Sequence, residues 1–176
     1  MLKTAEGRHF LRLSAEPVAL LTGILAVIHP RQYRMAKEVK TRTMNGGHCV
    51  SPLKQWASVY TAVTVLANRS TRYHRDLGSR FEWYDLLTSF GPYEQAPLYL
   101  GPIGLRINNY PGTVCAFSGM AFSHAVRKIE CSRVSMAFYM REDMRDGFGV
   151  PPAPFMSQND FEHYIGSQRG RLRSIV

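Results

Sequence analysis

A strict alternation of side chains runs through residues 133–141, RVSMAFYMR. If this segment is extended, one side is wholly apolar and the other carries Arg133, Ser135, Ala137, Tyr139 and Arg141. A period of two predicts a half-buried strand whose polar face is turned toward a site or cavity. A guanidinium binds a carboxylate through a rigid fork of donors, and a hydroxyl two residues further on adds a hydrogen bond to the same group. Arg133 and Ser135 are therefore suited to binding a carboxylate.

Three potential metal ligands precede this strand. His74 and Asp76 are separated by one residue, so in an extended segment both side chains point the same way. His124 lies nine residues before Arg133 and completes two histidines and one carboxylate, a set that binds non-haem Fe(II) while leaving coordination positions open. Taken singly, each residue also fits a structural role, and a zinc hydrolase on the same three ligands stays open.

The order of these pieces resembles the Fe(II)/2-oxoglutarate oxygenases, and most closely the branch related to the TET and J-binding-protein enzymes, which includes many fungal members. The resemblance covers roughly residues 56–141. The chain before this region is short for that family, and the tail after it gives no match. The residues that carry the resemblance are Trp56, Asn68-Arg69, His74-Arg75-Asp76, Trp83-Tyr84-Asp85-Leu86-Leu87, Tyr110-Pro111-Gly112-Thr113-Val114, Phe117-Ser118-Gly119, His124 and Arg133-Val134-Ser135.

The resemblance implies a mechanism and a set of site residues. Fe(II) is bound by His74, Asp76 and His124, and 2-oxoglutarate is decarboxylated to succinate while a C–H bond of the substrate is oxidised. The relatives imply a methylated nucleobase in DNA, 5-methylcytosine or 6-methyladenine, which must leave the base stack to react. In this mechanism Arg133 and Ser135 bind the far carboxylate of the co-substrate, and Asn68, at the end of the strand leading to the metal, is a further candidate contact or a turn-forming residue. Tyr139 and Arg141, on the same strand face as Arg133, and Ser79, just after the H-x-D segment, are the candidate contacts to the base.

The formal net charge of +9 favours a polyanionic partner such as nucleic acid, although a generally basic protein without such a partner also fits. Three cysteines without a C-x-x-C pair fit a reducing compartment. We expect an intracellular protein, in the nucleus if DNA is the substrate. Two other functions stay open: an oxygenase of the same fold acting on a protein or small molecule, and a nucleic-acid-binding module without turnover.

The remaining pattern predicts an α+β fold, with a double-stranded β-helix (jelly roll) core flanked by N-terminal helices. Helices are expected at 15–28 and 30–41, a loop at 44–50, and strands at 59–67, 81–90 and 113–117. A turn between two short strands is expected at 101–104 and a last helix at 159–165. We expect one oxygenase domain over residues 1–176, with helices in 14–42, a core of about 51–141 and a tail over 142–176. No apolar run reaches the length of a membrane span. The sequence does not indicate the oligomeric state.

Clusters of arginine and lysine accompany these elements. Arg31, Arg34 and Lys37 share a face of the second predicted helix, where they suit either a phosphate backbone or plain solvent. Four more arginines surround the H-x-D segment and allow the same two interpretations: Arg69, Arg72, Arg75 and Arg80. The sequence His74-Arg75-Asp76-Leu77 also opens a protein-kinase catalytic loop, but the required asparagine and glycine-rich loop are missing.

Overall fold

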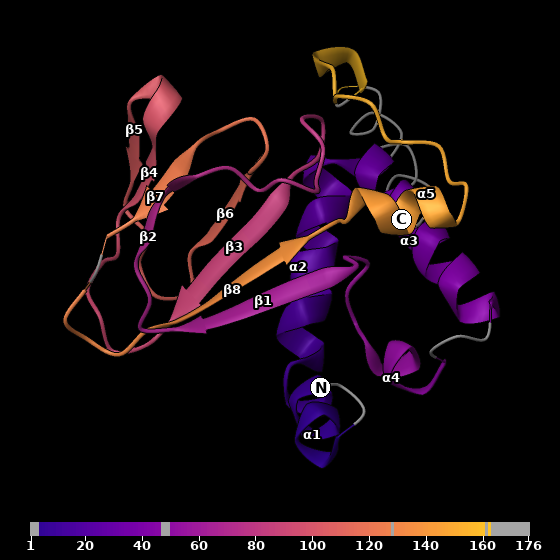
Figure 1. The fold of residues 1–176 in the computed structure, drawn as a ribbon, viewed down its shortest axis with the longest axis horizontal. Helices are drawn as coiled ribbons and strands as arrows, with labels where there is room; N and C mark the ends of the chain where they lie inside the picture. The colour runs from indigo at the N-terminus through magenta and orange to yellow at the C-terminus, as the bar shows by residue number, and fades with distance from the viewer. Residues whose placement is uncertain (1–3, 47–49, 128, 161, 163–176) are drawn as a thin grey trace, which may run out of the picture.

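A computed structural model describes residues 4–46, 50–127, 129–160 and 162. Helices occupy the N-terminal third, eight strands follow, and a short helix comes after the last strand (Figure 1). The helices are α1 (Ala5–Leu13), α2 (Ala15–Ile28), α3 (Pro30–Asn45), α4 (Val50–Gln55), the 3-10 turn η1 (Gly101–Ile103) and α5 (Glu142–Gly147). The strands are β1 (Ala62–Ala67), β2 (Thr71–His74), β3 (Asp85–Phe90), β4 (Leu98–Leu100), β5 (Leu105–Ile107), β6 (Val114–Phe117), β7 (His124–Val126) and β8 (Val134–Tyr139).

The strands form two four-stranded antiparallel sheets. One sheet has the order β1-β8-β3-β6 and the other has the order β2-β7-β4-β5. Apart from β4 and β5, neighbouring strands are not consecutive in sequence, so the chain passes repeatedly from one sheet to the other. The fold is therefore a mixture of helices and antiparallel sheet, as predicted, and this strand order is consistent with a jelly roll.

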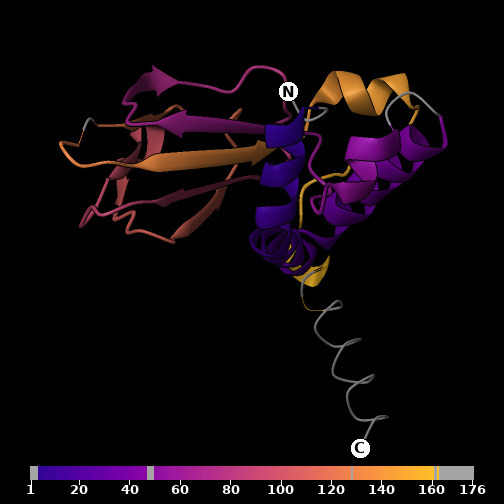
Figure 2. The same cartoon turned by 90° about the horizontal axis from the view of Figure 1, so that it is seen from below.

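The sheet β1-β8-β3-β6 lies between the helices and the second sheet, as Figures 1 and 2 show. Its helix-facing side carries Leu86 and Phe138, which pack with Leu25, Val39 and Trp83 in a cluster whose members are almost fully buried. Burying one such side chain contributes about 1.5–3 kcal/mol, so this cluster fixes the helices to the sheet.

A smaller cluster lies between the two sheets and is formed by Leu98, Leu100, Cys115 and Phe117. The alternation along β8 follows from these two environments. Phe138 is buried among the helix contacts, whereas Ser135, Ala137 and Tyr139 line a cavity between the sheets. The predicted division of this strand into two faces is confirmed.

The helix α3, which starts at Pro30, is capped at its N-terminus by His29. His29 Nδ1 accepts a hydrogen bond from the Gln32 backbone N–H (3.1 Å), and its Nε2 donates to the Glu82 carbonyl (3.0 Å). Burial lowers the pKa of His29, which favours the neutral form that can accept a hydrogen bond. His29 therefore has a structural role in the described part of the chain. The helix continues to Asn45, four residues beyond the predicted end, and so takes the first part of the predicted loop at 44–50.

Several predicted boundaries differ from the structure. β3 begins at Asp85 rather than residue 81, because Trp83 N–H bonds to the Arg80 carbonyl (3.2 Å) and Gln32 Oε1 accepts the Tyr84 N–H (2.8 Å). These hydrogen bonds occupy the backbone N–H groups of Trp83 and Tyr84, which would otherwise pair with a neighbouring strand.

The helices α1 and α5 were not predicted. The turn at 101–104 is present between β4 and β5. Residues 158–160 and 162 are helical, while most of the predicted helix at 159–165 and the basic end of the chain lie outside the described residues.

Among the described residues, no single helix has the length and apolar character needed to cross a bilayer. α1 and α2 reach that length and composition only when they are taken together across a bend of 58°.

Candidate metal centre and adjoining cavity

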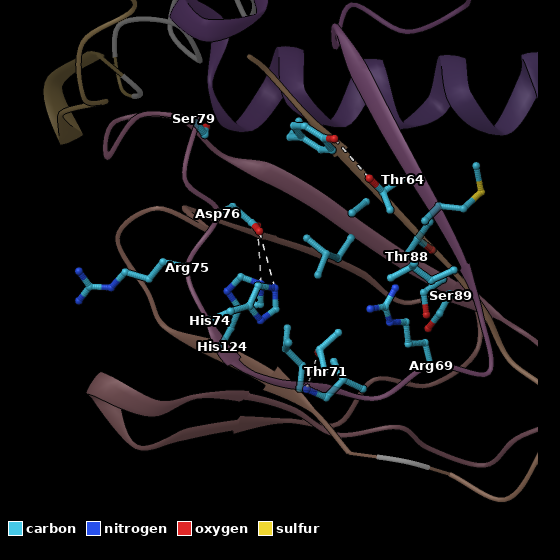
Figure 3. Close-up of a pocket in the computed structure, with 18 of the residues that line it drawn as sticks. Thr64, Arg69, Thr71, His74, Arg75, Asp76, Ser79, Thr88, Ser89 and His124 are labelled. Atoms are coloured by element: carbon cyan, nitrogen blue, oxygen red, sulfur yellow. Dashed lines mark hydrogen bonds and ion pairs between the residues drawn. The ribbon is translucent and has the colours of Figure 1, made fainter. Parts of the chain in front are cut away.

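His74, Asp76 and His124 meet at one point between the two sheets (Figure 3). His74 Nε2 lies 3.7 Å from Asp76 Oδ1, and His124 Nε2 lies 3.7 Å from Asp76 Oδ2. One ligand atom from each residue lies within 4.8 Å of the other two. Protein nitrogen and oxygen atoms bind a divalent ion such as zinc from roughly 2.0–2.2 Å. Atoms 3.7 Å apart can therefore both reach an ion placed between them.

The strands explain why the two histidines meet. His74 ends β2 and pairs directly with His124, which begins β7. The register shifts between Thr71 and His74, so β2 contains a bulge or similar irregularity there. The imidazole centroids are 4.3 Å apart.

Both imidazoles are oriented by backbone carbonyls. His74 Nδ1 lies 2.8 Å from the Arg72 carbonyl oxygen, and His124 Nδ1 lies 3.0 Å from the Phe122 carbonyl oxygen. A backbone carbonyl can only accept a hydrogen bond, so each Nδ1 is the donor. Each Nε2 therefore keeps its lone pair for a metal. Such partners are typical of metal-binding histidines. Burial lowers the pKa of His124, which also favours the neutral ligand form.

A second carboxyl group lies behind the cluster. Asp85 is almost fully buried, and its Oδ2 accepts the Gly119 N–H (3.1 Å), while the Gly119 carbonyl accepts the Asp76 N–H (3.0 Å). Asp85 Oδ1 has no hydrogen-bond partner. Burial, followed by the charge of Asp76, raises the pKa of Asp85 to about 8. The sequence analysis included Asp85 among the residues that carry the family resemblance but gave it no role in the site, and its other signal is a carboxylate at the start of an apolar strand.

The three residues line a cavity of about 300 Å³ between the sheets. Arg133 lines the same cavity and is 5% exposed. Its Nη2 donates to the Arg69 carbonyl (2.5 Å), but its Nε has no hydrogen-bond partner, and no described carboxylate forms an ion pair with it. A buried guanidinium without a counter-charge is costly. Arg133 is therefore suited to receive the carboxylate of a bound molecule.

A polar group adjoins Arg133 that the sequence analysis did not identify. Ser89 Oγ is 2.7 Å from the Tyr93 hydroxyl and accepts Asn109 Nδ2 (3.2 Å). Asn109 Oδ1 is buried without a partner. In Figure 3, Arg69 and Ser89 lie across the cavity from the His-Asp-His cluster. The cavity thus has a ligand cluster at one end and buried polar groups at the other.

The other predicted site residues occupy different positions. Ser135 lines the cavity, whereas Asn68 is exposed and does not line it. Asn68 has a φ of 53°, its Oδ1 accepts the Arg133 N–H (2.7 Å), and its own N–H donates to the Arg133 carbonyl (2.7 Å). These two bonds give Asn68 a positioning contact with Arg133.

The three predicted substrate contacts all line the cavity. The Tyr139 hydroxyl lies 3.3 Å from Thr64 Oγ1, and Ser79 Oγ is buried without a partner. Arg141 is exposed and bonds to Asp143 through Nη2 (3.1 Å) and Nε (3.3 Å). Ser79 and Tyr139 therefore offer free hydrogen-bonding capacity, while the Arg141 charge is already paired.

The basic residues around the H-x-D segment do not act as one group. Arg80 is paired with Glu82 (3.2 Å) and Glu142 (2.5 Å). Arg69 and Arg75 line the cavity, and Arg75 points away from the ligand cluster (Figure 3). Arg72 lies outside the cavity. Of the four arginines that the sequence allowed to contact phosphate, Arg80 is already paired with carboxylates and Arg72 does not line the cavity.

The basic face predicted on the second helix is also partly paired. Arg31 forms an ion pair with Asp160, and Arg34 Nε donates to the Pro30 carbonyl (3.3 Å). These contacts give Arg31 and Arg34 roles in packing, although the sequence also allowed both side chains to contact phosphate groups.

Comparison with known proteins agrees with this geometry. Residues 3–142 match the model of the Tet_JBP family, the oxygenase domain of the 2OGFeDO superfamily. The chain belongs to this family. Proteins of the 2OGFeDO superfamily use Fe(II) and 2-oxoglutarate, and the His-Asp-His cluster is a donor set that fits Fe(II).

The solved structure of NgTET1 in complex with 5mC DNA has the same fold as this Tet_JBP domain, with a TM-score of 0.61 and 14% sequence identity. The match covers 94% of this chain and 61% of the NgTET1 chain, so this chain spans less than two thirds of that protein. The polyketide cyclase RemF from Streptomyces resistomycificus matches with a TM-score of 0.30 and 18% identity, covering 58% of this chain and 67% of RemF, which is too weak for inference. A comparison with curated proteins finds no match.

Proposed function

We propose that this chain is an Fe(II)- and 2-oxoglutarate-dependent dioxygenase that oxidises a methylated nucleobase in DNA, 5-methylcytosine or 6-methyladenine. The observation that carries the proposal is a single cavity holding both the His-Asp-His cluster and the buried, unpaired Arg133. One end offers the donors that Fe(II) binds, and the other offers a cation for a dicarboxylate. The family match supports both assignments.

The metal ligands and the carbonyls that orient them have defined roles in this mechanism. His74, Asp76 and His124 bind the metal, with both imidazoles held in the required tautomer by the carbonyls of Arg72 and Phe122. When bound, Fe(II) and 2-oxoglutarate supply the oxidising chemistry, with dioxygen as oxidant and succinate and carbon dioxide as products.

The far carboxylate of the co-substrate is bound by the Arg133 guanidinium and the Ser135 hydroxyl. Asn68 acts through the Arg133 backbone, because the structure directs its side-chain oxygen to that N–H. A hydrogen-bonded carboxylate would also satisfy the Arg133 Nε, which has no partner among the described residues.

Substrate contacts are proposed for Ser79, Tyr139 and Arg141. A base reaches such a cavity by leaving the stack, after which an aromatic ring and polar side chains can recognise it. Tyr139 supplies the ring, and the unpaired Ser79 Oγ supplies a hydrogen bond. Arg141 contacts the base or its phosphate after exchanging its partner Asp143.

The DNA assignment is supported by the net charge of +9 and by the shared fold with NgTET1, whose structure contains 5mC DNA. We further propose that the domain is of the fungal type, that its strand order forms a double-stranded β-helix, that residues 1–176 act as one oxygenase domain, and that it works in the nucleus.

The test is succinate release from 2-oxoglutarate under aerobic conditions with Fe(II) and a DNA duplex. The duplex carries 5-methylcytosine, 6-methyladenine or no methyl group. We expect succinate to rise above the uncoupled background with one methylated duplex only, and the oxidised base to appear by mass spectrometry. Asp76→Ala should abolish turnover and leave salt-sensitive DNA binding largely intact.

Two results would reject the nucleobase assignment. Stimulation by a small molecule or protein but by neither duplex would show a same-fold oxygenase of different specificity. DNA binding with no succinate from any co-reactant would show a binding module without turnover.

A further inference from the structure

The outer face of the sheet β2-β7-β4-β5 carries a second groove, which shares only Thr71 and Val126 with the described lining of the metal-bearing cavity. The irregular register between Thr71 and His74 allows both of these side chains to line the inner cavity although they are three residues apart. The two residues between them, Arg72 and Tyr73, line the outer groove. The bulge in β2 thus places an arginine and a tyrosine side by side outside the sheet.

A second pair of the same kind comes from neighbouring strands. Arg127, directly after β7, lies over the ring of Tyr99 in β4, with 5.1 Å between the guanidinium carbon and the ring centroid. Both residues line the outer groove. Arg106 of β5 pairs in register with Tyr99 and is exposed at the border of this surface. The groove therefore alternates aromatic rings and guanidinium groups.

Tyr73 presents the surface of its ring as well as its hydroxyl group. Tyr73 is 59% exposed, and its ring rests on the backbone of Gly101, where an added Cβ would lie 2.9 Å from Tyr73 Cε1. That contact fixes the ring while leaving much of it accessible. Its orientation is therefore already ordered before a ligand arrives.

The charge of the groove is uncompensated. Among the residues that the structure describes, the lining contains no carboxylate, and neither Arg72 nor Arg127 forms an ion pair with any of them. This differs from the mouth of the inner cavity, where Arg80 and Arg141 are paired with acidic side chains. The two outer arginines are therefore available for phosphate.

We propose that this groove binds single-stranded nucleic acid, with a base stacked on the exposed Tyr73 ring and phosphates bound by Arg72 and by Arg127, whose guanidinium covers the Tyr99 ring. Surfaces that bind single strands combine a basic track with aromatic rings on which bases stack. A duplex offers no free base faces to the rings. The proposal does not depend on turnover at the inner cavity, because none of these four side chains belongs to the proposed catalytic group.

The test is fluorescence anisotropy of labelled oligo-dT with metal-free protein over a series of salt concentrations. Oligo-dT contains neither 5-methylcytosine nor 6-methyladenine, but thymine also carries a 5-methyl group, so the groove variants and the cross-link map described below assign the binding to the outer groove. For Arg72→Gln combined with Arg127→Gln, we expect the slope of log affinity against log salt to fall by about 1.4, since each phosphate contact to a single strand contributes about 0.7. Tyr73→Leu should weaken binding by about 5- to 150-fold, the value of one stacked base.

Arg12→Gln on α1 is the matched control, because it removes an exposed arginine from the helical side of the molecule. It should leave the slope unchanged. An equal loss in this control, or wild-type protein that binds oligo-dT with no salt dependence, overturns the proposal. So does binding to vesicles of anionic phospholipid that depends on Arg72 and Arg127 when oligo-dT binding does not.

A second measurement covers the case in which the double variant does not fold. Wild-type protein is irradiated with 5-bromouracil-substituted oligo-dT, and the cross-linked peptides are identified by mass spectrometry. We expect cross-links to Tyr73. Cross-links confined to the inner-cavity residues overturn the outer groove and leave the proposed oxygenase function untouched.

Discussion

Gly119→Ala should separate metal binding from folding. A Cβ at residue 119 would lie 2.4 Å from Asp76 Oδ2 and 2.6 Å from Asp85 Oδ2, whereas ordinary contact begins at 3.4 Å. Asp76 Oδ2 must therefore move by about 1.0 Å (3.4 − 2.4). Metal–ligand distances tolerate only about ±0.2 Å. The side chain of Asp76 is 41% exposed and can turn toward solvent, which would remove it from the ligand set.

Isothermal titration of the metal-free protein with Mn²⁺ or anaerobic Fe²⁺ measures the effect. We expect metal affinity to fall by at least the 10- to 100-fold seen when residues supporting metal ligands are changed. The free energy of unfolding should fall by about 1–3 kcal/mol, because buried Asp85 also shifts and its bond from Gly119 is disturbed.

Gly147→Ala is the matched control, since an added Cβ there meets nothing within 4 Å. It should keep both stability and metal affinity. Wild-type affinity in a folded Gly119→Ala protein would refute the placement of Asp76 against Gly119, and with it the proposed role of this carboxylate.

Three further predictions test other parts of the structure. Arg133→Met should weaken 2-oxoglutarate binding by about 2–5 kcal/mol, measured by calorimetry with Mn²⁺ present. The thermal unfolding temperature of the apo protein should stay unchanged or rise, because an unpaired buried charge is removed. Tight binding of 2-oxoglutarate by this variant would contradict the assignment. For Asp85, the folded pKa of about 8 exceeds the unfolded value, so the metal-free protein should lose stability as pH rises from about 4 to 8, by up to about 1.4 kcal/mol per pH unit. Asp85→Asn should flatten this dependence in chemical denaturation, and identical slopes would argue against a neutral Asp85. Lys40→Met should lower the free energy of unfolding by about 1–3 kcal/mol, because the carbonyls of Trp56 and Ser58 lose their donor; an unchanged midpoint would show that water replaces it.

Local patterns along the chain were sufficient to predict the H-x-D pair and the polar face of β8. His74 and Asp76 are two residues apart, and Arg133 and Ser135 follow the alternation of an extended strand, so their relative directions depend only on backbone geometry. The convergence of His124 with the H-x-D pair rested on the family resemblance, and the β2–β7 pairing now explains it.

The sequence alone could not predict features that depend on contacts between distant segments. Asn68 lies six residues before His74, yet its side chain is directed to the Arg133 backbone by the pairing of β1 with β8. Asp85 enters the site only because the Gly119 turn folds over it. The charges of Arg80 and Arg141 are largely neutralised by acidic partners whose positions follow from α5, a helix that no pattern predicted.

The sequence by itself determined which residues can bind a metal and a dicarboxylate, because donor chemistry and strand periodicity are properties of the residues and of their nearest neighbours. Only the tertiary structure decided which of them share a cavity, which charges remain unpaired, and that the bulge in β2 directs Arg72 and Tyr73 to the opposite face. Those outcomes follow from pairing between strands that are far apart in the chain, and no local pattern encodes that pairing.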